Sequence, residues 1–439
     1  MRELTQALHH EEAISWPRTH AIDYDSSLPL TLLHPVFRQF VDDCKHYQPT
    51  TEDIKFAIEF QYRMTVFMGA FRAESVITGL EKAGISFVQE WGNYVRSEGS
   101  HSDYHPGGVI DAGDFHSAIL MTVNEVGIDS REGSEPYAES IFAYIRFTEK
   151  GIQKHPRFNF PCFLLTVLGM CFSGMVWTDR PCYQVLAPTV PLFWNDTDRD
   201  MRLMFVRQIG AFRNARTLLQ RCYDILATPR FPKDLDPIFP DPRQYVSVET
   251  GETIKFDYVR KAVPKSATLV FMGTTSAHED ICIKYTQPYS KEAHMRCAAM
   301  GIAPPLRGFQ DIGSGWFMVV MDALDLSTYQ FIQKSWERNR PTEGQVAFIR
   351  ARLEDLHAAG FVHGDLRACN PLIPKTGEDG AMFIDFDFAG EIGKTVYPED
   401  IETEQIARPE DVTPYGLVLP EHDIAMLGYI VAHNWELQK

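Results

Sequence analysis

No C-x-x-C pair occurs in this 439-residue chain, although it contains eight cysteines. Zinc ribbons and zinc fingers are built on such pairs, so their absence argues against a structural zinc site. Three of the cysteines, Cys162, Cys171 and Cys282, lie inside apolar runs, as buried free thiols do. Unpaired thiols of this kind fit a reducing compartment, and we expect an intracellular protein, either cytoplasmic or nuclear.

Long uninterrupted hydrophobic runs are missing as well. The N-terminal segment Met1–His10 contains no apolar core of the kind that a secretory signal needs. The most hydrophobic segment, Phe160–Trp177, is broken by Pro161, Gly169 and Gly174, which favours paired strands over a membrane-spanning helix. We therefore expect no membrane partner. The sequence also shows no internal repeat, which argues against a solenoid.

The chain lacks the excess of positive charge that generic binding to nucleic acids requires. Its 59 acidic residues outnumber 42 lysines and arginines, and the formal net charge is −17. One basic stretch remains between residues 201 and 221, where a helix would carry arginines on one face and apolar residues on the other. A solvated helix face is the favoured interpretation, so a nucleic-acid partner is left open but not favoured. The arginines are Arg202, Arg207, Arg213, Arg216 and Arg221.

What is present is an ordinary globular composition, 44% hydrophobic and 23% charged, in a chain long enough for more than one domain. The polar, proline-punctuated start predicts an N-terminal arm over residues 1–48. Five prolines lie within the fifteen residues from Thr228 to Pro242. Proline at that density fixes an extended path, which predicts a linker over 228–243 between domains at 49–227 and 244–439.

The strongest chemical signal is the stretch His363-Gly-Asp-Leu-Arg-Ala-Cys-Asn370, followed by Asp385-Phe-Asp387. Phosphoryl transfer needs a carboxylate to receive the acceptor's proton, a carboxamide to hold a metal ion, and a second carboxylate to join metal and nucleotide phosphates. Asp365, Asn370 and Asp385 supply those groups in that order. The alternative is a polar loop beside an ordinary strand, but eight positions and a second, correctly spaced motif would then have to coincide by chance.

Residues upstream of these motifs fit a nucleotide site. The run Ile281-Cys-Ile-Lys284 places a lysine at the end of a short predicted strand, and a helix carrying Glu292 follows. A buried pair of Lys284 and Glu292 would orient the α- and β-phosphates, whereas a surface lysine on an edge strand is the alternative. A further predicted strand over 315–321 leads to Asp322 and Leu324, where backbone groups would meet an adenine ring.

With these motifs in place, residues 254–430 resemble the protein-kinase-like fold, and specifically small fungal kinase-like domains with an H-G-D-L-R-x-x-N loop and a D-F-D sequence. The resemblance implies a bilobal domain that transfers phosphate from ATP, with Mg²⁺ or Mn²⁺, to a serine/threonine-type acceptor, either a protein or a small molecule. By position it implies these roles: catalytic base for Asp365, contact with the transferred group for Arg367, metal ligands in Asn370 and Asp385, nucleotide binding by Lys284, Glu292, Asp322 and Leu324, and a brace for the loop in Asp423.

Three features depart from that family's pattern. No G-x-G-x-x-G precedes Lys284, and only Gly273 lies in the segment 271–277. Gly364 replaces the arginine that normally pairs with a phosphorylated activation loop, so activation by phosphorylation is not expected. Only 54 residues follow Asp385 (439 − 385), which predicts a short C-terminal lobe and leaves a peptide platform in doubt.

Residues 50–225 resemble the restriction-endonuclease-like domains of Crinkler-type effectors and related fungal proteins. The resemblance implies a mixed sheet with flanking helices. It rests on Asn124-Glu-Val-Gly127, Gly133-Ser-Glu-Pro-Tyr137, Pro161-Cys-Phe-Leu-Leu165 and the arginine-bearing helix that follows Pro191-Leu-Phe-Trp194.

The same domain lacks the residues of nuclease chemistry. Active members place an aspartate on one strand and E-x-K on the next, so that two carboxylates hold Mg²⁺. Here those positions read Pro106-Gly-Gly108 and Met121-Thr-Val123, and methionine, valine and glycine side chains cannot bind a hard cation. We expect an inactive domain that binds a partner, although Asp111, Asp114 and Glu125 leave a relocated site open.

The sequence therefore predicts a two-domain chain of the α/β and α+β classes. The favoured function is an ATP- and Mg²⁺-dependent phosphotransferase fused to an inactive nuclease-like domain. Two alternatives remain open, namely an interaction protein in which both domains lack turnover, and a nucleic-acid-directed effector with a relocated nuclease site.

Overall fold

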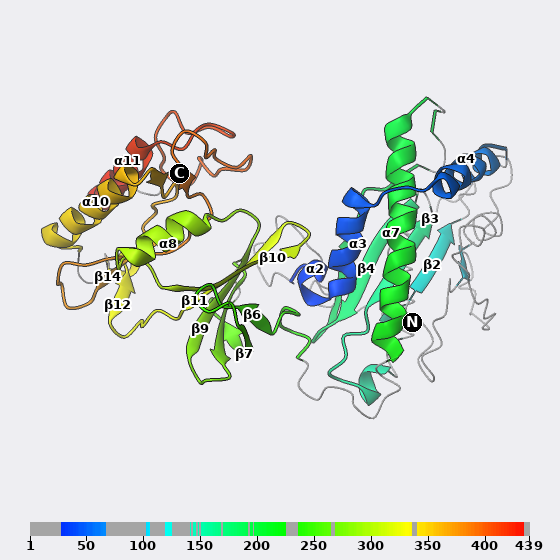
Figure 1. The fold of residues 1–439 in the computed structure, drawn as a ribbon, viewed down its shortest axis with the longest axis horizontal. Coiled ribbons are helices and arrows are strands. Elements are labelled where there is room, and N and C mark those ends of the chain that lie inside the picture. Colours follow the sequence, from blue (N-terminus) through cyan, green and yellow to red (C-terminus); the bar gives the residue numbers. More distant parts are fainter. Residues whose placement is uncertain are drawn as a thin grey trace. The chain divides into compact units, whose positions relative to one another are not determined.

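The computed structural model describes residues 28–66, 102–105, 119–124, parts of 141–195, 197–224, 236–264, 268–335 and 340–433. The chain divides into two compact units, Met1–Pro242 and Arg243–Lys439, called unit 1 and unit 2 below (Figure 1). The division falls within the predicted linker, of which residues 228–235 lie outside the described part. Within the described residues, no helix is both long and apolar enough to cross a lipid bilayer.

Unit 1 is built on a mixed five-stranded sheet whose strand order follows the chain. The pair β2–β3 is parallel and the other neighbouring pairs are antiparallel. A parallel pair needs a crossover, and helical positions between Ile141 and Lys154 lie in that connection. The strands are β1 (Ser102–His105), β2 (Ile119–Asn124), β3 (Cys162–Val167), β4 (Met170–Trp177) and β5 (Pro181–Val185).

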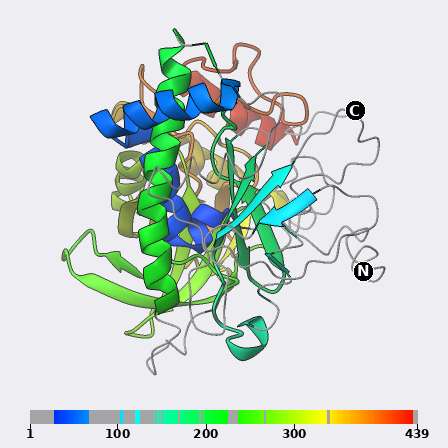
Figure 2. The same ribbon diagram turned by 90° about the vertical axis from the view of Figure 1, so that its right-hand side faces the viewer.

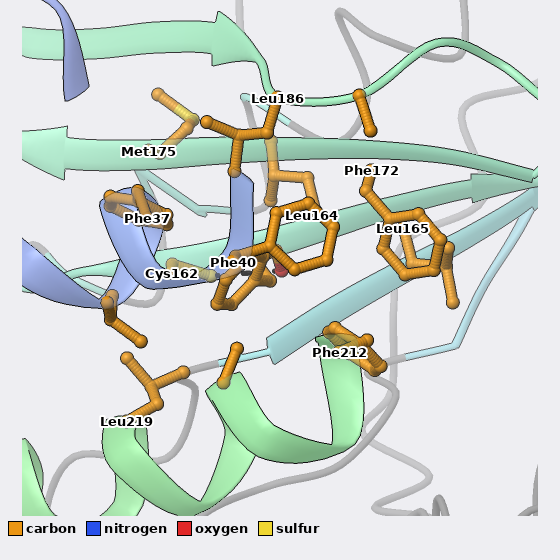
Figure 3. Close-up of a cluster of buried hydrophobic side chains, with 14 of the residues drawn as sticks. Phe37, Phe40, Cys162, Leu164, Leu165, Phe172, Met175, Leu186, Phe212 and Leu219 are labelled. Carbon is orange, nitrogen blue, oxygen red and sulfur yellow. Dashed lines mark hydrogen bonds between the residues drawn. The ribbon is translucent and has the colours of Figure 1, made fainter. Parts of the chain in front are cut away.

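Helices cover one face of this sheet, with α3 lying beside α7 (Figure 1, Figure 2). Their aromatic side chains meet on Phe163 of β3, whose ring lies 5.1 Å from that of Phe37, 5.2 Å from Phe40 and 5.5 Å from Phe212. Figure 3 shows this core, with side chains of both helices packed against the strands. The helices are α2 (Leu30–Leu33), α3 (Pro35–His46), α4 (Thr51–Val66) and α7 (Arg199–Asp224).

The expectation of an N-terminal arm over 1–48 needs correction for its second half. Phe37 and Phe40 on α3 are fully buried in the core of unit 1, and α3 begins with Pro35 at its first position. Proline there is pre-set for a helix and loses no hydrogen bond, so the residue that suggests a break instead starts an element. Residues 1–27 lie outside the described part.

Helix α7 carries the predicted arginines, and its predicted apolar residues Val206, Ile209, Phe212 and Leu219 are buried. Solvation of the basic face is only partial. Arg213 forms an ion pair with the buried carboxylate of Asp53 and a 3.2 Å hydrogen bond to the Tyr47 hydroxyl, whereas Arg221 is exposed. Part of the arginine face therefore stabilises the packing of α7 against its neighbours.

Unit 2 begins with a six-stranded antiparallel sheet of order β10-β11-β9-β8-β7-β6. Helix α8 (Lys291–Ala299) follows β9, and the Ser290 side chain caps it by accepting from the Ala293 amide. The strands are β6 (Gln244–Val246), β7 (Thr253–Lys261), β8 (Val270–Thr275), β9 (Asp280–Thr286), β10 (Leu306–Gly313) and β11 (Trp316–Asp322).

The remainder of unit 2 is organised around helix α10 (Glu343–Ala358), which packs against α11 (Pro420–Ala432). Thr342 and Gln345 form a reciprocal capping box that fixes the start of α10, and Gly360 follows its end with a φ of +89°. The small elements are β12 (Tyr329–Phe331), α9 (Ile332–Ser335), β13 (Phe361–Val362), β14 (Pro371–Pro374), β15 (Met382–Phe383) and β16 (Gly390–Glu391).

Candidate active site

The loop from His363 to Asn370 connects β13 to β14 and is anchored by one carboxylate of α11. Asp423 accepts hydrogen bonds from the amides of His363 (2.9 Å, Oδ2) and Gly364 (2.8 Å, Oδ1). Its Oδ2 also lies 2.9 Å from Nε2 of His357 on α10. Because Asp423 is almost fully buried, these bonds are sheltered from water and hold the loop at both carboxylate oxygens.

Gly364 is required by the backbone of this loop. Its φ is +79°, and a Cβ atom added there would lie 2.4 Å from the carbonyl oxygen of Phe388. Any residue with a side chain would therefore be strained by the left-handed conformation and would also clash with a backbone oxygen. The glycine at this position is thus built into the path of the loop, and an arginine could not be restored here by simple substitution.

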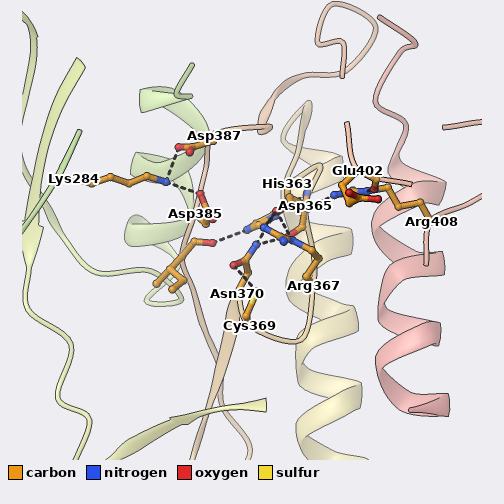
Figure 4. A network of polar contacts seen from close by, with 11 residues as sticks. Lys284, His363, Asp365, Arg367, Cys369, Asn370, Asp385, Asp387, Glu402 and Arg408 are labelled. Atoms are coloured by element: carbon orange, nitrogen blue, oxygen red, sulfur yellow. Dashed lines mark hydrogen bonds and ion pairs between the residues drawn. The ribbon is translucent and has the colours of Figure 1, made fainter. Parts of the chain in front are cut away.

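Asp365 lies in the middle of the loop, with only 3% of its surface exposed. Its Oδ2 accepts from Nε of Arg367 (2.8 Å) and from Nδ2 of Asn370 (3.1 Å), and its Oδ1 accepts from Nη2 of Arg408 (2.7 Å) (Figure 4). The Asn370 amide also donates to the carbonyl of Asp365 at 2.7 Å. Arg408 was missed at the sequence level, because it follows Asp365 by 43 residues in a segment without a motif.

Lys284 on β9 faces two carboxylates of the D-F-D sequence. Its Nζ lies 2.5 Å from Oδ1 of Asp385 and 2.7 Å from Oδ1 of Asp387 (Figure 4). The predicted pair with Glu292 needs correction, because Glu292 is exposed in the first turn of α8. The buried side chains of that helix are Ala293, His294 and Cys297, so its inward face carries no carboxylate.

Two opposing effects set the pKa values around Lys284, namely burial, which favours the neutral forms, and ion pairing, which favours the charged forms. Burial lowers the pKa of the Lys284 ammonium, but the charges of Asp385 and Asp387 raise the pKa further, so its net shift is upward. Burial likewise raises the pKa of Asp385, and the Lys284 charge outweighs it, so that this carboxyl has a lowered pKa. At Asp387 burial and the nearby Asp385 charge prevail over Lys284 and raise the pKa.

Two hydrogen bonds of Ile384 join the loop His363–Asn370 to the D-F-D segment. Its amide donates to the carbonyl of Asn370 at 3.1 Å, and its carbonyl lies 3.2 Å from Nε2 of His363. Asp385 follows with a φ of +71°, a conformation that is uncommon for a residue with a side chain and that aims its carboxylate at Lys284. The structure therefore brings Lys284, Asp365, Asn370 and Asp385 into one connected region.

Aromatic rings link the same region to α8. The Phe386 ring lies 5.4 Å from that of His363 and is stacked on that of His294 at 4.7 Å. His294 is fully buried, with Nδ1 2.7 Å from the Tyr289 hydroxyl and Nε2 2.8 Å from the carbonyl of Pro304. The position of α8 is therefore tied through His294 and Phe386 to the loop His363–Asn370 and to the D-F-D segment.

Burial of His294 makes the stability of unit 2 depend on pH. Burial lowers the pKa of this imidazole to about 4, from 6.5. Between those values the unfolded chain binds a proton that the folded chain does not, so stability is full above pH 6.5 and is lost as pH falls through this window. The loss should approach about 3 kcal/mol by pH 4. Urea unfolding of wild-type and His294→Gln chains from pH 7.5 to 4.5 measures it, and equal slopes for the two chains would contradict the expectation.

The predicted adenine region lies at the end of β11. The Asp322 carboxylate is bound by Nε of Arg307, and the Asp322 amide donates to the carbonyl of Pro305 at 3.0 Å. Leu324 follows, and within the described part of the chain its amide and carbonyl have no hydrogen-bond partner. Leu324 thus presents a donor and an acceptor of the kind that an adenine edge requires, whereas the side chain of Asp322 is already engaged.

Gly273 lies inside β8 and serves packing. A Cβ atom there would lie 2.7 Å from Cδ1 of Ile283 and 2.9 Å from the carbonyl oxygen of Asp257, so the glycine lets neighbouring strands approach. The connection between β7 and β8 spans residues 262–269 and contains no glycine, and residues 265–267 of it lie outside the described part.

The ligands available for a metal ion near Asp385 are all oxygen atoms. Asp385 and Asp387 contribute carboxylates, and Asn370 has a carboxamide oxygen whose contact is a 3.4 Å bond from the Cys369 thiol. Hard cations such as Mg²⁺ prefer this set. No three His, Cys, Asp or Glu side chains of the described residues gather closely enough to hold a metal by themselves.

No protein-family model matches the chain, and no curated protein does. Among solved structures it is similar to the kinase PK-1 of the Cydia pomonella granulovirus, with 15% identity and a TM-score of 0.34 over 41% of this chain and 68% of that one. It is also similar to vaccinia related kinase 3, with 14% identity and a TM-score of 0.30 over 44% of this chain and 67% of that one. These TM-scores are too low to identify a family.

Proposed function

We propose that unit 2 transfers the γ-phosphoryl group of ATP to a hydroxyl of the serine/threonine type. One observation carries the proposal: the groups that phosphoryl transfer requires come from three separate segments and meet in one network. Lys284 comes from β9, Asp365 and Asn370 from the loop after β13, and Asp385 from the segment after β15. The two low-scoring structural likenesses add no weight to it.

Each of these residues has a distinct task in the proposed reaction. Asp365 accepts the proton of the attacking hydroxyl, while the bond between the γ-phosphorus and the bridging oxygen breaks and ADP leaves. Lys284 binds phosphate oxygens of ATP, and the backbone of Leu324 binds the adenine edge. Arg367, whose side chain is partly exposed beside Asp365, neutralises charge on the transferred group. Asp387 takes the part that the sequence assigns to Glu292, because it is the second carboxylate on Lys284.

The oxygen ligands of the site fit a resident Mg²⁺ or Mn²⁺ ion. Asn370 and Asp385 would hold it, with Asp387 close by through Lys284. The ion would neutralise the negative charge of the ATP phosphates. Asn370 directs its NH₂ group toward Asp365, because Nδ2 donates both to the carbonyl and to Oδ2 of that residue. Its carboxamide oxygen is therefore left for the cation.

We propose that unit 1 is a binding module with a nuclease-like fold and no nuclease activity. The mixed sheet supports this, together with the sequence Met121-Thr-Val123 on β2, which has no carboxylate or lysine where active members carry E-x-K. Asp111, Asp114 and Glu125, the residues of a relocated site, lie outside the described part. Supercoiled plasmid incubated with the chain and Mg²⁺ should stay intact, and nicking that Glu125→Ala removes would contradict the proposal.

Loss of the Asp365 carboxylate should abolish transfer without abolishing nucleotide binding. We expect Asp365→Asn to lower the rate of transfer from radiolabelled ATP by about 10²- to 10⁴-fold, the contribution typical of a general base. Thermal shift with MgATP should be retained. Asp355→Asn is the matched control, because Asp355 is an exposed carboxylate of α10 paired with Arg352. Equal rates in wild-type and Asp365→Asn chains would reject the role of Asp365.

The alternative of an interaction protein without turnover is favoured by one observation. Both oxygens of the Asp365 carboxylate are already occupied, one by Arg367 and Asn370 and the other by Arg408. Oδ1 could accept a second hydrogen bond, but only 3% of Asp365 is exposed, so an acceptor hydroxyl has little room to approach while Arg408 is in place. Whether Arg408 can leave Oδ1 therefore distinguishes an enzyme that is inhibited at rest from a protein without activity.

A further inference from the structure

Arg408 reaches Asp365 from the segment between β16 and α11, residues 392–419. Its Nη2 donates to Oδ1 of Asp365 at 2.7 Å and its Nε donates to the carbonyl of Glu402 at 2.9 Å (Figure 4). The guanidinium also lies 5.9 Å from the ring centre of Phe388 and 6.0 Å from that of Tyr397. Only 3% of the side chain is exposed, so it fills the space in front of Oδ1.

The pairing of Arg408 is incomplete although it is buried. Its Nη1 is inaccessible to solvent and has no hydrogen-bond partner among the described residues. A buried donor without an acceptor is unfavourable, because it has lost its bonds to water. Arg367 forms a second ion pair with the other oxygen of Asp365. Arg408 is therefore incompletely paired in this position, and it is not the only cation that neutralises Asp365.

Arg408 stands where the proposed reaction needs an acceptor. A hydroxyl must lie within hydrogen-bond reach of the base before its proton can be transferred. Of the two oxygens of Asp365, Oδ2 is held by Arg367 and Asn370, which belong to the same loop as Asp365. Oδ1 is held by Arg408, which comes from a separate segment, so Oδ1 can be uncovered while the loop stays in place.

We propose that Arg408 is a self-inhibitory contact that must leave Asp365 before phosphoryl transfer can occur. This inference rests on the proposed phosphotransferase function. In the resting chain the guanidinium excludes both water and the acceptor from Oδ1. Movement of the segment 392–419 uncovers the carboxylate, and the freed guanidinium then pairs with an incoming anionic group, which satisfies Nη1 as well.

Contacts with α11 hold the inhibitory segment in place. The Tyr397 hydroxyl lies 3.0 Å from Nδ1 of His422, and Nε2 of His422 lies 3.2 Å from Oδ2 of Asp411. Backbone bonds from Tyr397 to Gly416 (2.9 Å) and from Val418 to Thr395 (2.9 Å) close the segment on itself. Tyr397 therefore offers a second place at which the segment can be loosened without altering Arg408.

The test measures ADP release from MgATP by the full-length chain, with water as the acceptor. Water attacks the γ-phosphorus, its proton passes to Oδ1 of Asp365, and ADP leaves with the bridging oxygen, so that ADP and phosphate are the products. We expect Arg408→Ala to release ADP at least about tenfold faster than wild type, since the lost charged hydrogen bond corresponds to that factor or more. Tyr397→Phe should give a smaller increase, and Arg408→Ala combined with Asp365→Asn should give none.

Lys394→Ala is the matched control, because Lys394 is an exposed cation of the same segment paired with Glu391. It should leave the rate unchanged. A rate for Arg408→Ala equal to or below that of wild type overturns the inhibitory role, and so does an Arg408→Ala chain that binds MgATP but releases no ADP. If Arg408→Ala does not fold, an unchanged rate in Tyr397→Phe overturns it instead. If neither wild type nor Arg408→Ala shows a thermal shift with MgATP, the proposed function itself fails, and this inference fails with it.

Discussion

Asp423→Asn is expected to destabilise unit 2 by about 3 kcal/mol, because one buried carboxylate accepts bonds from three donors and each unsatisfied buried donor costs about 1–3 kcal/mol. The His363 and Gly364 amides donate to opposite oxygens, so an asparagine must turn its own NH₂ group toward one of them. At that position the NH₂ group of the asparagine would face a backbone N–H, and neither can accept a hydrogen bond. Urea unfolding of the full-length chain, with hydrogen exchange of the amides after β13, measures the loss.

The same substitution should lower phosphoryl transfer by about 10²-fold or more, since a displacement of roughly 1 Å in catalytic geometry has that effect. Asp355→Asn is again the matched control, because that carboxylate of α10 is 48% exposed and pairs, among the described residues, with Arg352 alone. Its effect on stability should stay within about 0.5 kcal/mol. A loss of transfer in Asp423→Asn with unchanged stability and unchanged exchange at His363 and Gly364 would show that Asp423 does not act by anchoring the loop.

Two strands of unit 2 could be predicted closely because each has a local signature. Short apolar runs place β9 and β11 within a few residues of their observed bounds. Helices α2 and α3 of unit 1 could not be predicted in this way. Leu30, Phe37 and Phe40 are separated by polar residues and by Pro35, and only their packing against β3 and β4 shows that they form a core face.

The residues of the candidate site also differ in how far the sequence predicts them. Asp365, Asn370 and Asp385 lie in contiguous motifs, and the structure joins their segments through Ile384. Which carboxylate pairs with Lys284 is not a local property, because it depends on which face α8 turns inward. The motif contains Asp387 as a second aspartate, but nothing in its sequence pattern assigns that aspartate to Lys284. Arg408 had no signal at all, since its contact with Asp365 depends on the path of an irregular segment.

Lys284→Met is expected to cost about 3 kcal/mol of stability, because removing one partner of a buried ion pair leaves the other charge uncompensated. The side chain of Lys284 is 14% exposed, and two carboxylates depend on it. Asp385 and Asp387 would then face each other as like charges. Combining Lys284→Met with Asp387→Asn should recover about half of the lost stability, because only one of the two carboxylate charges remains. A double-mutant cycle measures this coupling between Lys284 and Asp387.

The same series distinguishes the observed pairing from the one that the sequence suggests. If Asp387 is the partner of Lys284, then Glu292→Gln should change stability by no more than about 0.5 kcal/mol, as surface substitutions do. Lys255→Met on β7 is the matched control for loss of an exposed lysine from the same sheet. MgATP should no longer shift the melting temperature of Lys284→Met, because the phosphates lose their cation. A large effect of Glu292→Gln, with no coupling between Lys284 and Asp387, would contradict this pairing and would mean that Glu292 is the partner of Lys284.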